Sequence, residues 1–289
     1  MFEISTSQAR VQVREDLGAA VASYNLVDGR AVFRPAPTDA ADEFDMACNI
    51  MLPWCNRISD GGFYVDDVFY PLAPNREGDA LPLHGNAFQQ VWTLKAQTES
   101  SVTLTLESTS LTPFHYLAEV TYVLHGADLA VKLSVKNLSN IRLPYGVGLH
   151  PWFIQEPDTL LTTSTETVIL TDQSQLPVKS VSLEEVPEWD FRTQQHLPKD
   201  GFDHCFTGWS REALISWPSR QLQLNIQADE ALSYCHIYSR NNREDFFCFE
   251  PVSHPLNAHN WPDRSLSTLK ILEQGEVFLT SCVFKPSQI

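Results

Sequence analysis

Alternation of apolar and polar residues with a period of two is the feature that most constrains the fold of this chain. Residues 102–106 read Val-Thr-Leu-Thr-Leu, and residues 221–227 read Gln-Leu-Gln-Leu-Asn-Ile-Gln. Successive side chains of a strand point to opposite faces, so this pattern predicts strands with one buried face. Long helical periodicity is scarce and no GxGxxG motif occurs, which disfavours a doubly wound nucleotide-binding fold.

Two further stretches add to the strand pattern. Residues 117–124 are rich in β-branched and aromatic side chains, a His-Gly-Ala-Asp turn follows, and alternation resumes over residues 129–135. This arrangement predicts an antiparallel hairpin. Residues 277–284 are largely apolar on both sides, so we expect that strand to lie inside a sheet or between two sheets.

Composition supports one large domain with a substantial core. Of the 289 residues 43% are hydrophobic and 19% are charged, which excludes a largely disordered chain. The 18 prolines and 12 glycines are spread along the chain rather than gathered in a linker, and no repeat of fixed period occurs. We therefore predict an all-β fold, a single large antiparallel β-sandwich domain covering residues 1–289.

Charge and targeting features narrow the classes of partner. The chain has 20 Lys and Arg against 36 Asp and Glu, a net charge of −16, and no basic run longer than a pair. Binding to nucleic acid or to an anionic membrane needs a concentrated basic face, so neither is expected. The N-terminus lacks the pattern of a signal peptide, and no apolar stretch is long enough to span a bilayer. The six scattered cysteines predict reduced, buried thiols and a cytoplasmic protein.

Four segments combine turn residues, aromatics and ionisable groups more densely than a connecting loop requires: 52–63, 83–92, 144–153 and 246–258. In the last of these Glu250 ends an apolar run, Phe-Phe-Cys-Phe, and precedes a proline. A carboxylate in such a place is partly desolvated, which raises its pKa and makes it a better base near neutrality. The alternative is an ordinary strand-end glutamate in solvent or in a structural ion pair.

Four other residues are candidates with a functional and a structural interpretation each. His150 follows Gly-Val-Gly-Leu and precedes Pro-Trp, and His84 precedes a glycine; either is a proton carrier or a packed structural histidine. Arg57 could hold sugar hydroxyls with its fork of donors or form a salt bridge. Asp203 could accept hydrogen bonds from hydroxyls or cap a turn beside Gly201.

Neither a metal nor an organic cofactor is expected. The chain has no H-x-H, no HExxH and no Cys/His ligand spacing, and it lacks a GxSxG elbow and a phosphate-binding glycine loop.

Taken in order, the four segments and a fifth motif resemble the aldose 1-epimerase (galactose mutarotase-like) family, and in particular its shorter bacterial branch. The motifs are NRI-x-x-GGF from residue 56, LHGN from 83 followed by Trp92, GVGLHPWF from 146, FDHCF from 202, and FEP from 249 with a later NA. The resemblance implies that family's fold, a large β-sandwich of antiparallel sheets. One departure is the Leu-His-Pro-Trp-Phe segment, where the galactose mutarotases carry N-H-x-Y-F, so the substrate preference stays open.

The resemblance also implies roles for the candidate residues. Glu250 matches the catalytic base and His150 the catalytic acid, while Arg57, His84 and Asp203 match residues that hold sugar hydroxyls. The implied reaction exchanges the α and β anomers of a free aldose: one group takes the C1 hydroxyl proton while the other protonates the ring oxygen, the ring opens, and it closes on the other carbonyl face. Such proton transfers need no cofactor.

Three alternatives remain. A hexose-6-phosphate 1-epimerase would need a basic cluster, and the sequence offers only Arg57 and Arg76. A non-catalytic carbohydrate-binding β-sandwich would not need both Glu250 and His150. A glycoside hydrolase or polysaccharide lyase is disfavoured because hydrolysis uses two carboxylates, and only Glu250 has a strong claim. The expected partner is a small sugar such as glucose or galactose, and the sequence predicts no oligomeric state.

Overall fold

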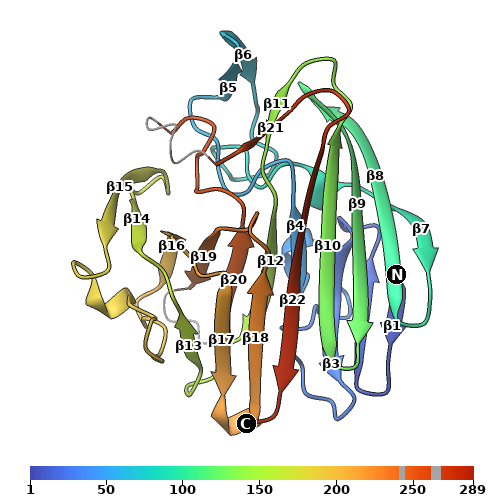
Figure 1. Ribbon diagram of the computed structural model, residues 1–289, viewed down its shortest axis with the longest axis vertical. Helices are drawn as coiled ribbons and strands as arrows, with labels where there is room; N and C mark the ends of the chain where they lie inside the picture. Colours follow the sequence, from blue (N-terminus) through green and yellow to red (C-terminus); the bar gives the residue numbers. More distant parts are fainter. Residues whose placement is uncertain (241–244, 262–267) are drawn as a thin grey trace.

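The computed structural model describes residues 1–240, 245–261 and 268–289, and nearly all of its regular structure is β (Figure 1). Two large antiparallel sheets contain most of the strands, which confirms the all-β fold class. The described helical segments are short 3-10 turns, none of which could cross a membrane: η1 (Glu43–Asp45), η2 (Ala87–Gln89), η3 (Pro187–Trp189) and η4 (Pro218–Arg220).

One sheet has ten strands, in the spatial order β1 (Phe2–Ser5), β2 (Ala9–Arg14), β3 (Ala20–Leu26), β4 (Cys48–Met51), β12 (Gly148–Ile154), β20 (Phe246–Val252), β19 (Tyr234–Ser239), β16 (Phe202–Thr207), β14 (Thr167–Thr171) and β15 (Pro177–Ser182). The other has eight, in the order β13 (Leu160–Thr163), β17 (Glu212–Trp217), β18 (Leu222–Ala228), β22 (Val277–Ser287), β10 (Asp128–Asn137), β9 (Phe114–His125), β8 (Ser101–Leu111) and β7 (Thr93–Gln97). Two short ribbons pair β5 (Gly62–Val65) with β6 (Val68–Pro71), and β11 (Leu143–Tyr145) with β21 (Lys270–Leu272).

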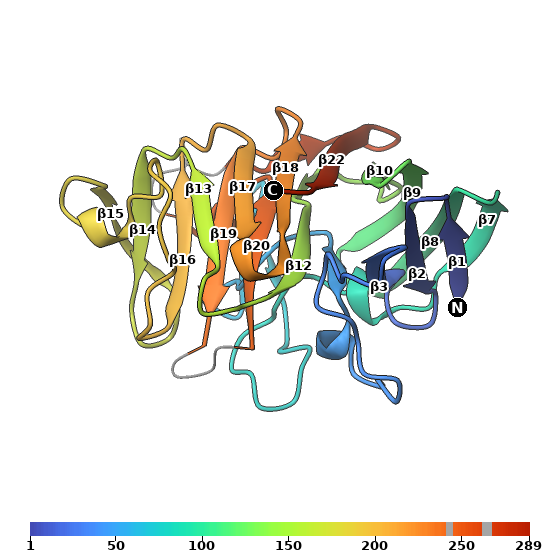
Figure 2. The ribbon, with the colours of Figure 1, turned by 90° about the horizontal axis from the view of Figure 1, so that it is seen from below.

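The two large sheets form the layers of a sandwich. Figure 1 shows β17, β18, β22, β10, β9 and β8 side by side in front of β4, β12 and β20, and Figure 2 shows β14 and β15 at one end of the molecule with β1 and β7 at the other. Phe33 joins the layers: its ring centroid lies 5.5 Å from that of Phe153 on β12 and 4.9 Å from that of Phe284 on β22. All three rings are fully buried, and each such side chain contributes about 1.5–3 kcal/mol of transfer free energy.

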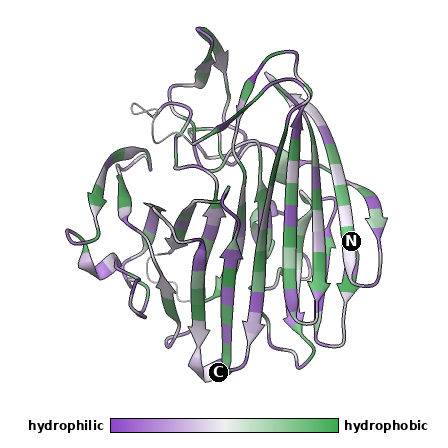
Figure 3. Cartoon of the chain, viewed as in Figure 1, coloured by the Kyte–Doolittle hydropathy of each residue, from purple (hydrophilic) through white to green (hydrophobic). Residues whose placement is uncertain are grey.

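The predicted hairpin is confirmed as β9 and β10, whose closing pair is His125 with Asp128. The prediction that the C-terminal strand lies inside a sheet or between two sheets is confirmed. β22 does lie inside a sheet, between β18 and β10, but it is not enclosed on both faces. Phe278 and Phe284 are buried, whereas Val277 and Leu279 are 54% and 68% exposed, so apolar residues here extend onto the solvent face. Figure 3 shows hydrophobic and hydrophilic residues interspersed along the strands of both large sheets.

The centre of the ten-stranded sheet differs from the eight-stranded sheet, because its strands β12 and β20 are buried on both faces. Phe153 and Phe247 pack into the core between the sheets, whereas Trp152, Phe246 and Cys248 form a separate cluster on the opposite face. Loops of the N-terminal third of the chain cover that opposite face, and polar groups face a pocket there.

Candidate active site

Strand register places three ionisable side chains in a row on the outer face of the ten-stranded sheet. Pairing of Gly148 with Val252 on the neighbouring strands β12 and β20 brings His150 opposite Glu250, and pairing of β19 with β20 puts His236 opposite Glu250 from the other side. Directly opposed residues lie on one face with Cβ atoms about 4.5–5.5 Å apart. All three side chains are buried and line one pocket of about 460 Å³.

His150 and Glu250 form the closest acid–base pair of this row. Nε2 of His150 lies 3.4 Å from Oε1 of Glu250, and the two side chains are 7% and 4% exposed. Burial raises the pKa of the Glu250 carboxyl to about 8, against the opposing effect of the His236 and Arg57 charges. Burial also lowers the pKa of His150 to about 3, and His236 and Arg34 add to this effect. At neutral pH the pair therefore holds one proton between two groups that each disfavour charge.

The environment of His150 fixes its ring. The indole of Trp152 stacks on it with centroids 5.1 Å apart and an interplanar angle of 18°, and the ring of His84 meets it edge-on at 5.3 Å. His84 is fixed in turn, because the backbone N–H of Asn56 donates to its Nδ1 over 3.0 Å. Burial, together with the nearby His150 and Arg57, keeps the pKa of His84 well below its usual range, so His84 is neutral and its Nε2–H is a donor.

Arg57 brings a cation to the same pocket. Its backbone forms a β-bridge with Leu83, next to His84, and its backbone N–H donates a hydrogen bond to Oδ1 of Asn56. Within residues 1–240, 245–261 and 268–289 its guanidinium makes no hydrogen bond or ion pair. An unpaired fork of donors facing buried carboxylates is well placed to bind hydroxyl oxygens.

Asp203 lies at the far side of the pocket, two strands from Glu250. Its Oδ1 accepts a hydrogen bond from Nε2 of His236 over 2.5 Å, and its Oδ2 accepts one from Nε2 of Gln175 over 2.6 Å. Burial alone would raise the pKa of Asp203, but the bond to His236 and its positive charge lower it. The same bond keeps the pKa of His236 well above its usual range despite burial. Asp203 and His236 are thus an ion pair.

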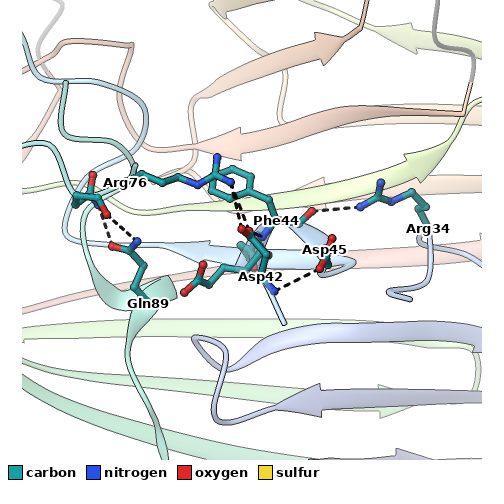
Figure 4. Close-up of polar contacts among 9 residues, drawn as sticks. Arg34, Asp42, Phe44, Asp45, Arg76 and Gln89 are labelled. Carbon is teal, nitrogen blue, oxygen red and sulfur yellow. Dashed lines mark hydrogen bonds and ion pairs between the residues drawn. The ribbon is translucent and has the colours of Figure 1, made fainter. Parts of the chain in front are cut away.

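A short segment around η1 supplies Asp42, Phe44 and Asp45 to the pocket lining, and Figure 4 shows the contacts of these residues. The guanidinium of Arg76 lies over the Phe44 ring, 3.8 Å from its centroid, and reaches Asp42 at 3.5 Å. On the other side Arg34 donates to the backbone carbonyl of Phe44 over 3.4 Å. The Asp45 side chain accepts from the Asp42 backbone N–H, completing a capping box. Phe44 is therefore held between two arginines.

The pocket wall is more basic than the sequence suggested. Arg34 and Arg240 join Arg57 and Arg76 there, which corrects the expectation that no basic cluster exists beyond the latter two. Besides Glu250 and Asp203, which is paired with His236, four carboxylates line the same pocket: Asp42, Asp45, Asp79 and Asp245.

One group of three side chains has metal-ligand spacing within the described part of the chain. Ligand atoms of His150, Cys248 and Glu250 all lie within 4.8 Å of one another. A thiol binds metal as the thiolate, and burial holds the pKa of Cys248 well above its usual range. The donor set thus favours the protonated, non-ligating thiol, and the expectation of no metal stays a prediction.

All five residues singled out from the sequence line this one pocket: Glu250, His150, Arg57, His84 and Asp203. Glu250 is the fifth residue of β20 rather than a strand-end residue, and it is 3% exposed. His254, which lies near Glu250 in sequence, instead accepts a hydrogen bond from the Cys55 backbone outside the pocket. Of the aromatic residues in the segments singled out from the sequence, Trp152 lines the pocket, whereas Phe153 and Phe63 are in the core.

Sequence reasoning missed His236, Gln175, Arg34, Arg240 and Phe44. His236 lies in a short, largely buried strand that carries no recognisable motif, and Gln175 lies in a polar turn, so neither has a local signal. Only the pairing of β19 with β20 and the position of the β14–β15 turn bring them to the site.

Comparison with known proteins extends over the whole chain. Residues 1–285 match the family model described as aldose 1-epimerase. The uncharacterized protein YphB of Escherichia coli K12 is 29% identical over 226 residues, 76% of this chain and 77% of YphB. The uncharacterized protein YihR of the same organism is 28% identical over 247 residues, 78% of this chain and 75% of YihR.

Solved structures agree with the family match. A crystal structure of an E. coli K12 protein, provisionally described as an aldose 1-epimerase, superimposes with a TM-score of 0.93 at 25% identity, covering 100% of this chain and 99% of that one. A galactose mutarotase-like protein from Clostridium acetobutylicum has a TM-score of 0.86 at 20% identity, with 99% and 95% covered. The second likeness shows that the fold is galactose mutarotase-like.

Proposed function

Because this chain belongs to the aldose 1-epimerase family, we propose that it is an isomerase that interconverts the α and β anomers of a free aldose. The observation that carries the proposal is the buried pair of His150 Nε2 and Glu250 Oε1, 3.4 Å apart in a pocket that also presents an unpaired Arg57. Anomer exchange needs one group to take a proton and another to give one at neighbouring oxygens, and this pair supplies both.

The pair accounts for the protons of ring opening. Glu250 takes the proton of the C1 hydroxyl while His150 gives a proton to the ring oxygen, the bond from C1 to that oxygen breaks, and a carbonyl forms at C1. Both oxygens are bonded to C1, so two neighbouring side chains can serve them. After rotation about C1–C2 the roles reverse: His150 takes the proton from the hydroxyl that re-forms the ring, and Glu250 returns one to the carbonyl oxygen.

This sequence requires a carboxylate on Glu250 and an imidazolium on His150 at the start. The pKa directions instead favour the neutral carboxyl and the neutral imidazole in this buried pair. The two states contain the same number of protons and differ by one transfer between Nε2 and Oε1. Polar sugar hydroxyls near the pair would lower the cost of the charged state, because burial is the main reason that both groups are neutral. Each acid–base group contributes about 10²–10⁴-fold to rate.

Polarimetry of freshly dissolved α-D-glucose and α-D-galactose tests the proposal. We expect the protein to speed the decay of optical rotation of at least one sugar above the spontaneous rate, to the same final rotation. A sugar that binds to the protein without any acceleration would contradict an epimerase and leave a non-catalytic carbohydrate-binding sandwich.

A second candidate, a hexose-6-phosphate 1-epimerase, is favoured by the four arginines of the pocket wall, and in particular by the buried Arg34 Nε, which has no hydrogen-bond partner among the residues that the structure describes. We propose that free hexoses are nevertheless preferred, because the four carboxylates on the same wall repel a dianion. Comparison of kcat/KM for glucose and glucose 6-phosphate decides between them. A tenfold or greater preference for the phosphate, about 1.4 kcal/mol of transition-state binding, would overturn our choice.

A further inference from the structure

The turn between β14 and β15 contributes the side chain of Gln175 to the pocket, although this turn contains none of the sequence motifs described above. Gln175 occupies this turn with φ of +58°, and Asp172 braces it by accepting from the backbone N–H groups of Ser174 and Leu176 over 2.8 and 3.1 Å. From this position Gln175 lines the pocket and its Nε2 donates to Oδ2 of Asp203.

The charge of Asp203 fixes which way the Gln175 amide points. Asp203 is ionised because Nε2 of His236 donates to its Oδ1, and an ionised carboxylate only accepts hydrogen bonds. Gln175 must therefore turn its NH₂ group toward Asp203, which leaves its carbonyl oxygen as an acceptor. Among the residues that the structure describes, no group donates to that carbonyl oxygen.

The acceptor lies on the side of the pocket away from the acid–base pair. Strand β16, which carries Asp203, is separated from β20 by β19, so the two strands are about 10 Å apart. A sugar whose C1 lies beside the His150–Glu250 pair, and whose ring extends along the pocket toward β16, would bring its distal hydroxyls to Asp203 and Gln175, whereas its C2 hydroxyl stays beside C1.

We propose that Gln175 is a specificity-determining residue that accepts a hydrogen bond from a distal hydroxyl of the aldose, at C3, C4 or C6 but not at C2. The inference rests on the proposed function, and it extends it by requiring a substrate with an unsubstituted hydroxyl at one of those carbons. His236 acts through Asp203: its charge keeps the carboxylate ionised and so keeps the Gln175 amide in the acceptor orientation.

Two variants and a matched control test the proposal. Gln175→Asn retains an amide and tolerates the positive φ, but it is one methylene too short to reach both Asp203 and a sugar. Gln175→Glu has the same length but places a second carboxylate against Asp203. Ser174→Ala changes the exposed neighbour in the same turn and should have no effect.

The measurement is kcat/KM for glucose and for its 2-, 3-, 4- and 6-deoxy derivatives. We expect Gln175→Asn to lower kcat/KM for glucose about three- to tenfold, the value of one hydrogen bond, and Gln175→Glu to lower it further. For one of the 3-, 4- or 6-deoxy sugars the loss should vanish, because the hydroxyl that Gln175 binds is already missing. The 2-deoxy sugar should show the full loss. Equal losses for all five sugars, or no loss for any, would overturn the inference.

Failure of the proposed function would be visible separately, as a lack of turnover by the wild-type protein. The inference would then be decided by sugar binding, followed through the fluorescence of the pocket residue Trp152 and its neighbours. A weaker affinity of Gln175→Asn for glucose, but not for one distal deoxy sugar, would support it. Unchanged affinities for the whole series would refute it.

Discussion

The eight-stranded sheet and the centre of the ten-stranded sheet differ in how the two faces of their strands are buried. In β8, β9 and β10 burial alternates residue by residue, with apolar side chains inward and polar side chains outward. In β12 and β20 both faces are buried, and the face away from the core carries His150 and Glu250. The outer face of the eight-stranded sheet is solvated, whereas the outer face of the ten-stranded sheet forms a pocket at its centre.

The difference shows where free energy of folding is gained and where it is given up. Alternate burial in the eight-stranded sheet removes apolar surface from water and leaves polar groups solvated. In the pocket, by contrast, burial raises the pKa of Glu250, which costs stability at neutral pH, and lowers the pKa of His150, which costs stability at acid pH. Substitutions in the pocket should therefore lower activity more than stability, and substitutions in the core should lower stability more than activity.

The largest expected effect is a loss of catalysis when Glu250 or His150 in the pocket is replaced. Glu250→Gln and His150→Asn keep polar side chains but remove the titratable groups, so each should fold and lose about 10²–10⁴-fold in kcat. Because both groups act on one coupled step, the double variant should lose far less than the product of the single losses. Circular dichroism confirms folding. Near-wild-type kcat in folded Glu250→Gln would remove Glu250 from the mechanism.

The next effect is on stability, from the core between the sheets. Phe284→Ala removes a buried ring that packs on Phe33, and it should lower the free energy of unfolding by about 3–5 kcal/mol without altering kcat of the folded fraction. Leu279→Ala, on the exposed face of the same strand, is the matched control and should cost about 0.5 kcal/mol or less. Denaturant melts measure both. Equal losses of unfolding free energy at the two positions would contradict the assignment of one buried and one exposed face to β22.

A smaller effect links the pocket to stability through pH. The Glu250 pKa of about 8 lies above its ordinary value of 4.5, so between these values folding takes up a proton and wild-type stability declines as pH rises. Glu250→Gln lacks this group, so its stability relative to wild type should increase from about pH 5 to about pH 8, by at most about 1.4 kcal/mol per pH unit. Denaturant melts at several pH values give the difference. A difference that stays constant with pH would show that Glu250 is not buried as the neutral acid.

The smallest expected effect is that of a chelator. Proton transfer by His150 and Glu250 needs no metal, and the neighbouring Cys248 favours the protonated thiol. Dialysis against EDTA should leave the rate of anomer exchange unchanged. Loss of activity that Zn²⁺ or Mg²⁺ restores would assign the group of His150, Cys248 and Glu250 to a metal instead.

The same contrast explains what could be predicted from the sequence. Alternation in residues 102–106 and the turn at residues 125–128 are local signals, and they predicted β8 and the β9–β10 hairpin correctly. The apolar pattern of residues 277–284 placed β22 inside a sheet but could not show that one of its faces is exposed. Exposure depends on what packs there, which no local pattern contains.

For the pocket, local context made Glu250 and His150 candidates, resemblance to a family supplied their roles, and the structure brings them within 3.4 Å of each other. Gln175 and His236 could not be found in this way. His236 reaches the site only through strand pairing with β20 and β16, and Gln175 only through the path of a turn. Both positions depend on contacts between residues distant in sequence.

The most direct test of the central claim is anomer exchange at equilibrium, followed by NMR magnetisation transfer between the α and β H1 signals of glucose or galactose. The account predicts that wild-type protein raises the exchange rate in proportion to its concentration, for at least one of the two sugars, without changing the α:β ratio. It also predicts that Glu250→Gln at the same concentration returns the rate close to the spontaneous value. An exchange rate that the wild-type protein does not change, or that both proteins raise equally, would contradict catalysis by the buried pair of His150 and Glu250.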